Sequence, residues 1–265
     1  MDKLSDQFSH QSPYISIDNS PVLLSDPSGL STNVVKNKDG TYKVIGGKPY
    51  DGDNGIYIVN SENKRIGGPF AYSATPHSFY FSDSEKKKGD GKGTWHGTIN
   101  LQDQSGRNFL NNQILKQAPG VLKYMLNARN GKKLDFKTTN GKDKPIYKSD
   151  DIEAFYRGMP IWGTYNGKPI VASARDIGNI AAGFIAGRNG MGWSTARLGF
   201  DGYQSYASGK GFSSESSGTK YAERLGWNIG RALYYKLEVS RLPSNGHYRN
   251  VTVPNTIIKK NDYHP

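Results

Sequence analysis

The chain has 265 residues, enough for one large or two small domains with a buried core, and its formal net charge is +12. It contains no cysteine, which excludes disulfide bonds, thiol chemistry and zinc sites built on cysteine. No apolar run is long enough to predict a transmembrane helix, and the first six residues have neither the basic nor the apolar region of a signal peptide.

The charge is unevenly distributed along the chain. Residues 1–30 contain one lysine and four aspartates, a balance of −3, so residues 31–265 carry +15. A body this basic favours a polyanionic partner, such as nucleic acid or another anionic surface. A basic surface that only keeps the protein in solution is the alternative interpretation.

Residues 1–30 are predicted to form a separate unit. Short strands are expected at 12–17 and 22–24, with turns at 18–21 and 26–29. Because two short strands are too little to fold alone, this unit is expected to be the last hairpin of something larger.

Residues 31–105 are predicted to be a β-rich linker or N-terminal part. The dipeptide Asp39-Gly40 separates extended stretches at 33–35 and 41–45, which is a strong hairpin signal. Further strands are expected at 55–59 and 78–81. A charged, glycine-rich loop at 84–93 is expected to be solvated.

Residues 106–237 are predicted to be mainly helical. Their apolar spacing predicts two short helices within 108–126 and longer helices at 176–187, 193–206 and 219–237. Residues 157–163 are predicted as a turn between strands, and 238–265 as an extended C-terminal tail. The expected fold class is therefore α+β, with a small β-rich part followed by a mainly helical domain.

A motif ends the first unit: Pro21 to Leu30 fits the pattern P-x4-D-P-x-G-L. It resembles the end of the Rhs repeat-associated core, a shell that cuts its own cargo free, and this resemblance implies self-cleavage between Leu30 and Ser31. Such cleavage needs one carboxylate as base and a second, protonated one to polarise the carbonyl. Asp26 fits one role, and Asp2 lies where the core's other aspartate is expected. A plain Asp-Pro turn is the alternative.

Short glycine-marked blocks follow at 131–137, 176–184 and 222–226, with Gln204 and Gly209 between the last two. In this order they resemble the polymorphic toxin type 44 family, which is often assigned a nuclease activity. The resemblance implies a toxin domain over 106–237. The chain departs from the family pattern at 215–220, where Glu215 is the acidic residue.

No histidine falls between residues 97 and 246, so a site in this segment is expected to use carboxylates, amides and cations. Asp135 and Lys137 are expected on one face of an extended segment, and Asp176 and Asn179 on one face of a helix. With Gln204 and Glu215, these are the candidate catalytic residues.

Arg175 and Arg188 are the candidate substrate-binding residues, able to meet a phosphate or a sugar oxyanion. No metal ligands are assigned, and both Mg²⁺-dependent and metal-free acid–base chemistry stay open. Structural roles are the alternatives: Asp176 as the N-cap of a helix at 178–187, Asp135 and Lys137 as a surface pair on a strand, and Gln204 on a helix surface.

Three functions are weighed. The first is a nuclease toxin acting on RNA or DNA of competitor cells, supported by the basic body and by tyrosines and tryptophans able to stack on bases. The second is a lysozyme-like peptidoglycan hydrolase with Asp176 or Glu215 as the acid. The third is a non-enzymatic, membrane-active toxin.

The resemblance also implies partners and a route. An Rhs shell would encapsulate the toxin, and a type VI or similar secretion system would deliver it into a target cell. An acidic immunity protein would neutralise it by covering the basic face around Asp135–Asn179. No membrane span is expected.

Overall fold

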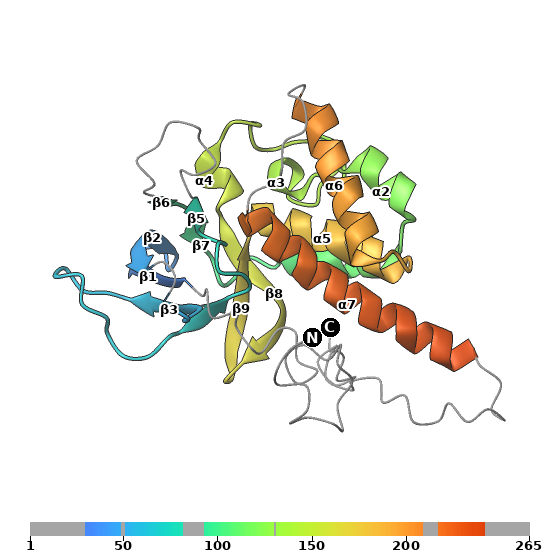
Figure 1. Cartoon of the computed structure of the whole chain (residues 1–265). Coiled ribbons are helices and arrows are strands. Elements are labelled where there is room, and N and C mark those ends of the chain that lie inside the picture. The colour runs from blue at the N-terminus through green and yellow to red at the C-terminus, as the bar shows by residue number, and fades with distance from the viewer. Residues whose placement is uncertain (1–29, 49–50, 82–92, 130, 209–216, 242–265) are drawn as a thin grey trace.

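The computed structural model describes residues 30–48, 51–81, 93–129, 131–208 and 217–241, with the backbone alone at 203–208, 217 and 238–241. It contains both helices and strands, so the predicted α+β class is confirmed. The helices gather on one side of the strands (Figure 1).

Seven strands of the described residues form one closed barrel, in the order β1-β2-β7-β8-β9-β4-β3. They are β1 (Ser31–Lys36), β2 (Tyr42–Lys48), β3 (Gly55–Ile58), β4 (Ala71–Ser73), β7 (Thr98–Ile99), β8 (Gly158–Tyr165) and β9 (Lys168–Ser173). Two further strands, β5 (Tyr80–Phe81) and β6 (Thr94–Trp95), pair with each other. The barrel therefore joins strands from both sides of residue 105.

Two hairpins in this barrel have glycine turns that set their geometry. The predicted β1–β2 hairpin is confirmed, with Gly40 at a φ of 84°. The β8–β9 hairpin closes through Asn166 and Gly167, at φ values of 48° and 69°. Two consecutive residues with positive φ match the right-handed twist of the strands they join, and Asn-Gly is the pair that adopts this turn most easily.

Seven side chains fill the barrel. Each of them is apolar and almost fully buried. In a strand with one buried face, side chains alternate between the core and solvent, so every second side chain points inward. They are Val34, Val44, Ile56, Ala71, Phe79, Ile99 and Val171.

The helices follow in chain order. They are α1 (Ser105–Asn108), the π-helix η3 (Phe109–Lys116), α2 (Val121–Asn127), α3 (Phe136–Thr139), α4 (Ile152–Phe155), α5 (Ala174–Arg188), α6 (Trp193–Ser208) and α7 (Ser217–Arg241). A second core lies between them, and α5 supplies its centre through Ile177, Ile180 and Phe184, each at most 1% exposed.

Helices α5 and α7 cross with their backbones in contact. A Cβ atom added to Gly183 would lie 1.9 Å from the carbonyl oxygen of Glu223, and one added to Gly226 would lie 1.9 Å from that of Ile180. The next glycine along each helix, Gly187 and Gly230, makes the same kind of approach. Gly183 and Gly187 therefore allow α5 to pack closely on α7.

Three local predictions are wrong. Residues 157–163 are not a turn, because 158–163 belong to β8, with an irregular register between Pro160 and Thr164. Residues 238–241 are not extended, because α7 continues to Arg241. Of the strand expected at 78–81, only β5 at Tyr80–Phe81 forms.

Candidate active site

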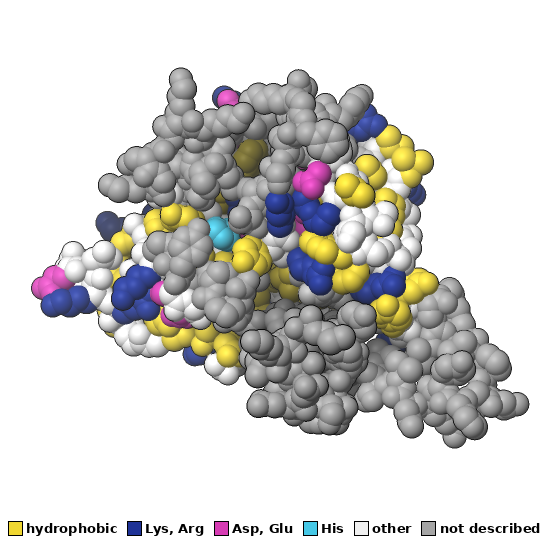
Figure 2. Space-filling view, in the orientation of Figure 1, with side chains coloured by type: hydrophobic (Ala, Val, Ile, Leu, Met, Phe, Trp, Pro, Cys, Tyr) yellow, Lys and Arg dark blue, Asp and Glu magenta, His cyan; other side chains and the backbone are white. Residues whose placement is uncertain are grey.

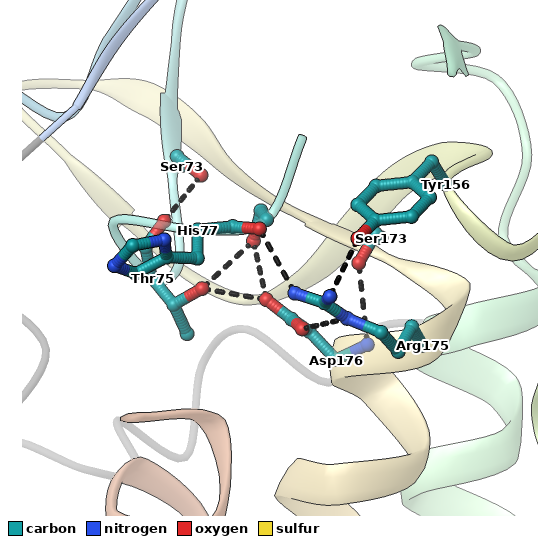
Figure 3. Close-up of polar contacts among 8 residues, drawn as sticks. Ser73, Thr75, His77, Tyr156, Ser173, Arg175 and Asp176 are labelled. Carbon is teal, nitrogen blue, oxygen red and sulfur yellow. Dashed lines mark hydrogen bonds and ion pairs between the residues drawn. The ribbon is translucent and has the colours of Figure 1, made fainter. Parts of the chain in front are cut away.

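A fully buried carboxylate stands in the first turn of α5. Ser173 caps this helix, since its hydroxyl accepts the backbone N–H of Asp176 at 3.2 Å. The Asp176 side chain is 0% exposed, and its Oδ2 accepts hydrogen bonds from the hydroxyls of Thr75 at 2.5 Å and Ser78 at 2.8 Å. The alternative role of Asp176 as N-cap is therefore wrong: Ser173 is the cap, and Asp176 ties α5 to the turn after β4 (Figure 3).

Arg175 lies beside this carboxylate and connects it to an aromatic ring. Its Nε donates to Oδ1 of Asp176 at 3.2 Å, and its other two nitrogens donate to the hydroxyl of Tyr156 at 2.6 Å and to the carbonyl of His77 at 3.0 Å. The guanidinium carbon also lies 4.8 Å from the Tyr156 ring centroid. Asp176 thus fixes the position of a cation whose side chain is 16% exposed.

His96 approaches the same tyrosine from the barrel. Its ring centroid lies 5.4 Å from that of Tyr156. Nδ1 of His96 lies 3.2 Å from a carboxylate oxygen of Glu153, and Nε2 lies 2.8 Å from the exposed hydroxyl of Thr94. A histidine held between a carboxylate and a hydroxyl has the arrangement of a general base.

Glu153 has further partners that keep it charged. Its carboxylate pairs with Lys43 at 2.5 Å and accepts the backbone N–H of Gly97 at 3.2 Å. Burial raises the pKa of Glu153, but hydrogen bonds from Lys43 and His96 lower it by more, so that pKa lies below its ordinary value. Glu153 is therefore ionised at neutral pH and able to stabilise a protonated His96.

His77 brings the start of α7 to this group. It is 4% exposed, and its ring stacks on that of Tyr221 with centroids 5.8 Å apart. A Cβ atom added to Gly218 would lie 2.7 Å from Cβ of His77 and 2.9 Å from a guanidinium nitrogen of Arg175. The candidate site is thus assembled where the strands, the start of α5 and the start of α7 meet.

The residues around Asp176 do not fit a Mg²⁺ ion. Both carboxylate oxygens already accept hydrogen bonds, one of them from a guanidinium, whereas Mg²⁺ takes free carboxylate oxygens. Among the described residues, no group of three histidine, aspartate or glutamate side chains is arranged to hold a metal ion.

Asp135, a second predicted acidic residue, makes only local contacts. It is 5% exposed, and its Oδ2 accepts the backbone N–H of Gly131 at 2.9 Å and the hydroxyl of Thr138 at 2.6 Å. The expectation that Asp135 and Lys137 lie on an extended segment is wrong, because residues 136–139 form α3. The Lys137 ammonium instead lies 5.4 Å from the Phe155 ring centroid.

The remaining candidates are spread over the molecule. Asn179 lies on α5, half-buried, one turn after Asp176. Arg188 lies at the other end of α5, where it donates to the carbonyl of Leu115 at 2.8 Å and where burial lowers its pKa. The structure therefore places Arg175 and Arg188 about 20 Å apart along the helix. The backbone at Gln204 belongs to α6, and its side chain lies outside the described part.

Most of the predicted cleavage unit lies outside the described residues. Asp2 and Asp26 lie outside the described residues, as does Glu215. Leu30 is described and is 0% exposed at the entrance to β1. The hydroxyl of Ser31, the next residue, donates to Asp51 at 2.5 Å and accepts from Arg65 at 2.5 Å.

Sequence reasoning missed four residues of this site: His77, His96, Glu153 and Tyr156. Both histidines precede the segment from 97 to 246, which directed attention away from them. In the structure β6, directly before His96, pairs with β5, which follows His77. The contact of His96 with Tyr156 depends on the barrel and could not be inferred from either segment alone.

Within the described residues, no helix is long and apolar enough to cross a membrane, as the sequence predicted. Comparison with protein-family models, with curated proteins and with solved structures found no match for this chain.

Proposed function

We propose that residues 31–265 are the released part of an Rhs-type polymorphic toxin, that residues 1–30 are the end of its shell, and that the released, basic part cuts nucleic acid in competitor cells. The cleavage motif at Pro21 to Leu30 and the ordered blocks between 131 and 226 support the toxin assignment. The charge of +15 over residues 31–265 supports a polyanionic substrate. The observation that carries the nuclease chemistry is the convergence of His96 and Arg175 on Tyr156.

The proposed reaction is metal-free phosphodiester cleavage by acid–base catalysis. The attacking hydroxyl, from water or a ribose, replaces the Thr94 hydroxyl at Nε2 of His96 and gives its proton to that nitrogen. Glu153, which lies at Nδ1, stabilises the imidazolium that results. Arg175 offsets the negative charge that grows on the phosphate oxygens as the new P–O bond forms. The P–O bond to the leaving oxygen then breaks, and that oxygen takes the proton back from Nε2 of His96.

Asp176 has a different role in this proposal from the catalytic one expected at first. A carboxylate that is 0% exposed and accepts three hydrogen bonds neither reaches a substrate nor gives up a proton to one. It is a positioning residue, which holds Arg175 and the turn that carries His77. This burial also argues against Asp176 as the acid of a peptidoglycan hydrolase.

The test compares substrates and variants directly. Purified protein is incubated with total RNA, plasmid DNA and peptidoglycan sacculi, with and without EDTA. The proposal expects nucleic acid to be cut in both conditions and the rate to fall about 100-fold or more in His96→Ala. Lys38→Ala, on the exposed β1–β2 turn, is the matched control and should cut normally.

Two results would contradict the proposal. If only sacculi are degraded, the wall-hydrolase alternative takes its place. If nucleic acid is cut equally fast by His96→Ala, the site has been assigned to the wrong residues. Expression of the protein in the cytosol and in the periplasm gives an independent answer, because a nuclease should kill from the cytosol.

Release and neutralisation are tested separately. We expect a longer chain that includes its shell to be cut between Leu30 and Ser31, as read by mass spectrometry, and Asp26→Asn to stay uncut. We also expect an acidic protein encoded next to the toxin to protect cells by covering the basic face around Asp135–Asn179. If the parent chain stays uncut, the self-cleavage part of the proposal is wrong. If the acidic protein does not protect cells, the immunity part is wrong.

A further inference from the structure

One face of α7 carries a row of cationic and aromatic side chains. We call this row the α7 stripe: Arg224, Trp227, Arg231, Tyr234 and Tyr235. Spacings of three and four residues place all five on the same side of the helix. The opposite side packs on α5 through Ala222, Gly226 and Ile229. The stripe therefore borders the contact with α5, with Arg224 and Tyr235 exposed and the other three side chains half-buried.

The cations and rings of the stripe hold one another in place. The Arg224 guanidinium lies 4.7 Å from the ring of Trp193, on α6, and 4.8 Å from that of Trp227. The Arg231 guanidinium lies 4.8 Å from the Tyr234 ring and 4.6 Å from the Tyr235 ring. Each arginine thus sits beside two aromatic rings, which is a stabilising arrangement for a guanidinium.

Two backbone contacts anchor the stripe to the turn between α5 and α6. The indole N–H of Trp227 donates to the carbonyl of Met191 at 2.8 Å, and Arg231 donates to the carbonyl of Gly190 at 2.6 Å. A surface held in this way loses little side-chain entropy when it binds a ligand.

The stripe keeps its positive charge available. Among the described side chains, no acid pairs with Arg224 or Arg231. Of the two acids on α7, Glu223 is buried and paired with Arg197, and the side chain of Glu238 lies outside the described part. Arg224 is exposed, and the Tyr235 side chain is 49% exposed. Figure 2 shows Lys and Arg side chains gathered with hydrophobic ones over this part of the molecule.

The stripe also leads to the candidate active site. Helix α7 begins where Gly218 lies against His77 and Arg175, and Arg224 is the first stripe residue after that contact. At 1.5 Å per residue, the path from Gly218 to Tyr235 is about 26 Å, and the two stripe arginines are about 10 Å apart. A chain-like polyanion lying on α7 would therefore reach the site at one end.

From these contacts we infer that the α7 stripe binds single-stranded nucleic acid and guides it to the site formed by His96, Tyr156 and Arg175. The inference rests on the proposed nuclease function and names its substrate class. Arginines contact phosphates, and aromatic rings stack on bases that are not paired, which a duplex does not offer. An acidic protein could use the cations but has no bases to stack on the rings.

The test measures binding in the His96→Ala background, so that cleavage does not interfere. Fluorescence anisotropy is recorded with labelled 20-nucleotide RNA and DNA single strands and with the matching duplex. We expect both single strands to bind more tightly than the duplex. The double variant Arg224→Ala/Arg231→Ala should bind at least tenfold more weakly, with a salt slope smaller by about 1.4, since each phosphate contact contributes about 0.7.

Aromatic stacking is tested by Tyr235→Ala, which should weaken single-strand binding about tenfold and leave the salt slope unchanged. The control is Lys116→Ala/Lys123→Ala, which removes two exposed cations of η3 and α2 and should change binding much less. Circular dichroism checks that every variant is folded. A variant that is not folded is replaced by Arg224→Gln/Arg231→Gln, which must show the same loss.

The outcomes separate this inference from the proposed function. Unchanged binding in the stripe variants, or equal affinity for single strands and duplex, overturns the inference even if the protein cuts nucleic acid. Tight single-strand binding that depends on the stripe supports the inference even if no cleavage is found. If the stripe variants lose only the acidic immunity protein and keep nucleic-acid binding, the inference is also overturned.

Discussion

Replacing Gly183 by alanine should destabilise the protein strongly, although alanine is the better helix former. The new Cβ would lie 1.9 Å from the carbonyl oxygen of Glu223, and Cβ contacts under 3.0 Å essentially never occur in proteins. The obstructing atom belongs to the backbone of α7 and cannot rotate away. The two helices must therefore separate by about 1 Å, which opens gaps around Ala222 and Ile180.

The expected size follows from two opposing effects. Overpacking at a rigid contact costs about 3 kcal/mol, and replacing glycine by alanine inside a helix returns about 1 kcal/mol. The free energy of unfolding should thus fall by about 2 kcal/mol. Gly178→Ala is the matched control on the same helix, because nothing lies within 4 Å of its added Cβ. It should stabilise the protein by about 0.5–1 kcal/mol.

Urea denaturation followed by circular dichroism measures both variants. The difference of about 3 kcal/mol between them corresponds to a gap of about 6–12 °C in melting temperature for a protein of this size. If Gly183→Ala proves as stable as Gly178→Ala, the backbones of α5 and α7 are not in contact, and the placement of α7 beside His77 fails with them.

Three further substitutions test the polar contacts. Asp176→Asn leaves the half-buried Arg175 without its carboxylate and should lower the free energy of unfolding by about 3 kcal/mol, whereas Asp143→Asn, 80% exposed, should leave the melting temperature unchanged. Arg157→Lys keeps the charge but loses the fork that donates to the carbonyls of residues 136 and 137; calorimetry should show a loss of about 1.5–3 kcal/mol. The pKa of Glu153 is lower in the folded chain than its ordinary 4.5, so its carboxylate stabilises the fold above that pH and stops doing so as the pH falls through the folded pKa. Glu153→Gln should be less stable than the parent at pH 7 by under about 1 kcal/mol, and urea titrations should show the gap closing as the pH falls below 4.5.

Local signals predicted the elements whose geometry is set by their own residues. Asp39-Gly40 predicted the first hairpin, and the apolar spacing of 219–237 predicted most of α7, because both patterns act within a few residues. The same reasoning failed at 157–163. Gly158, Pro160 and Gly163 are typical of a turn, but here they lie in β8, whose register is irregular between Pro160 and Thr164, with Gly163 at a φ of 80°. Proline and glycine are tolerated in a strand at such a bulge.

The site was harder to predict than the elements, because its residues meet only through the barrel. The sequence predicted Asp176 as a catalytic residue from its position in a motif. In the structure its carboxylate accepts hydrogen bonds from Thr75 and Ser78, so it is a positioning residue instead. These two residues lie about a hundred positions earlier in the chain. A hydrogen bond over that separation leaves no periodic trace in the sequence, so its acceptor looks like any carboxylate at a helix start.

The contacts that close the fold are also those that assemble the site. β9 pairs with β4, and the chain then runs from β9 directly into α5, so Asp176 and the Thr75 turn are brought together by the same step that completes the barrel. The same step brings Arg175 to Tyr156, because Arg175 adjoins Asp176 and Tyr156 directly precedes the strand β8, which pairs with β9. His96 reaches Tyr156 because β7 pairs with the start of β8. The β-rich segment is therefore part of the proposed chemistry. A toxin domain cut to residues 106–237 would keep Arg175 but would lose His96, and it would also lose the hydroxyls of Thr75 and Ser78 that hold Asp176.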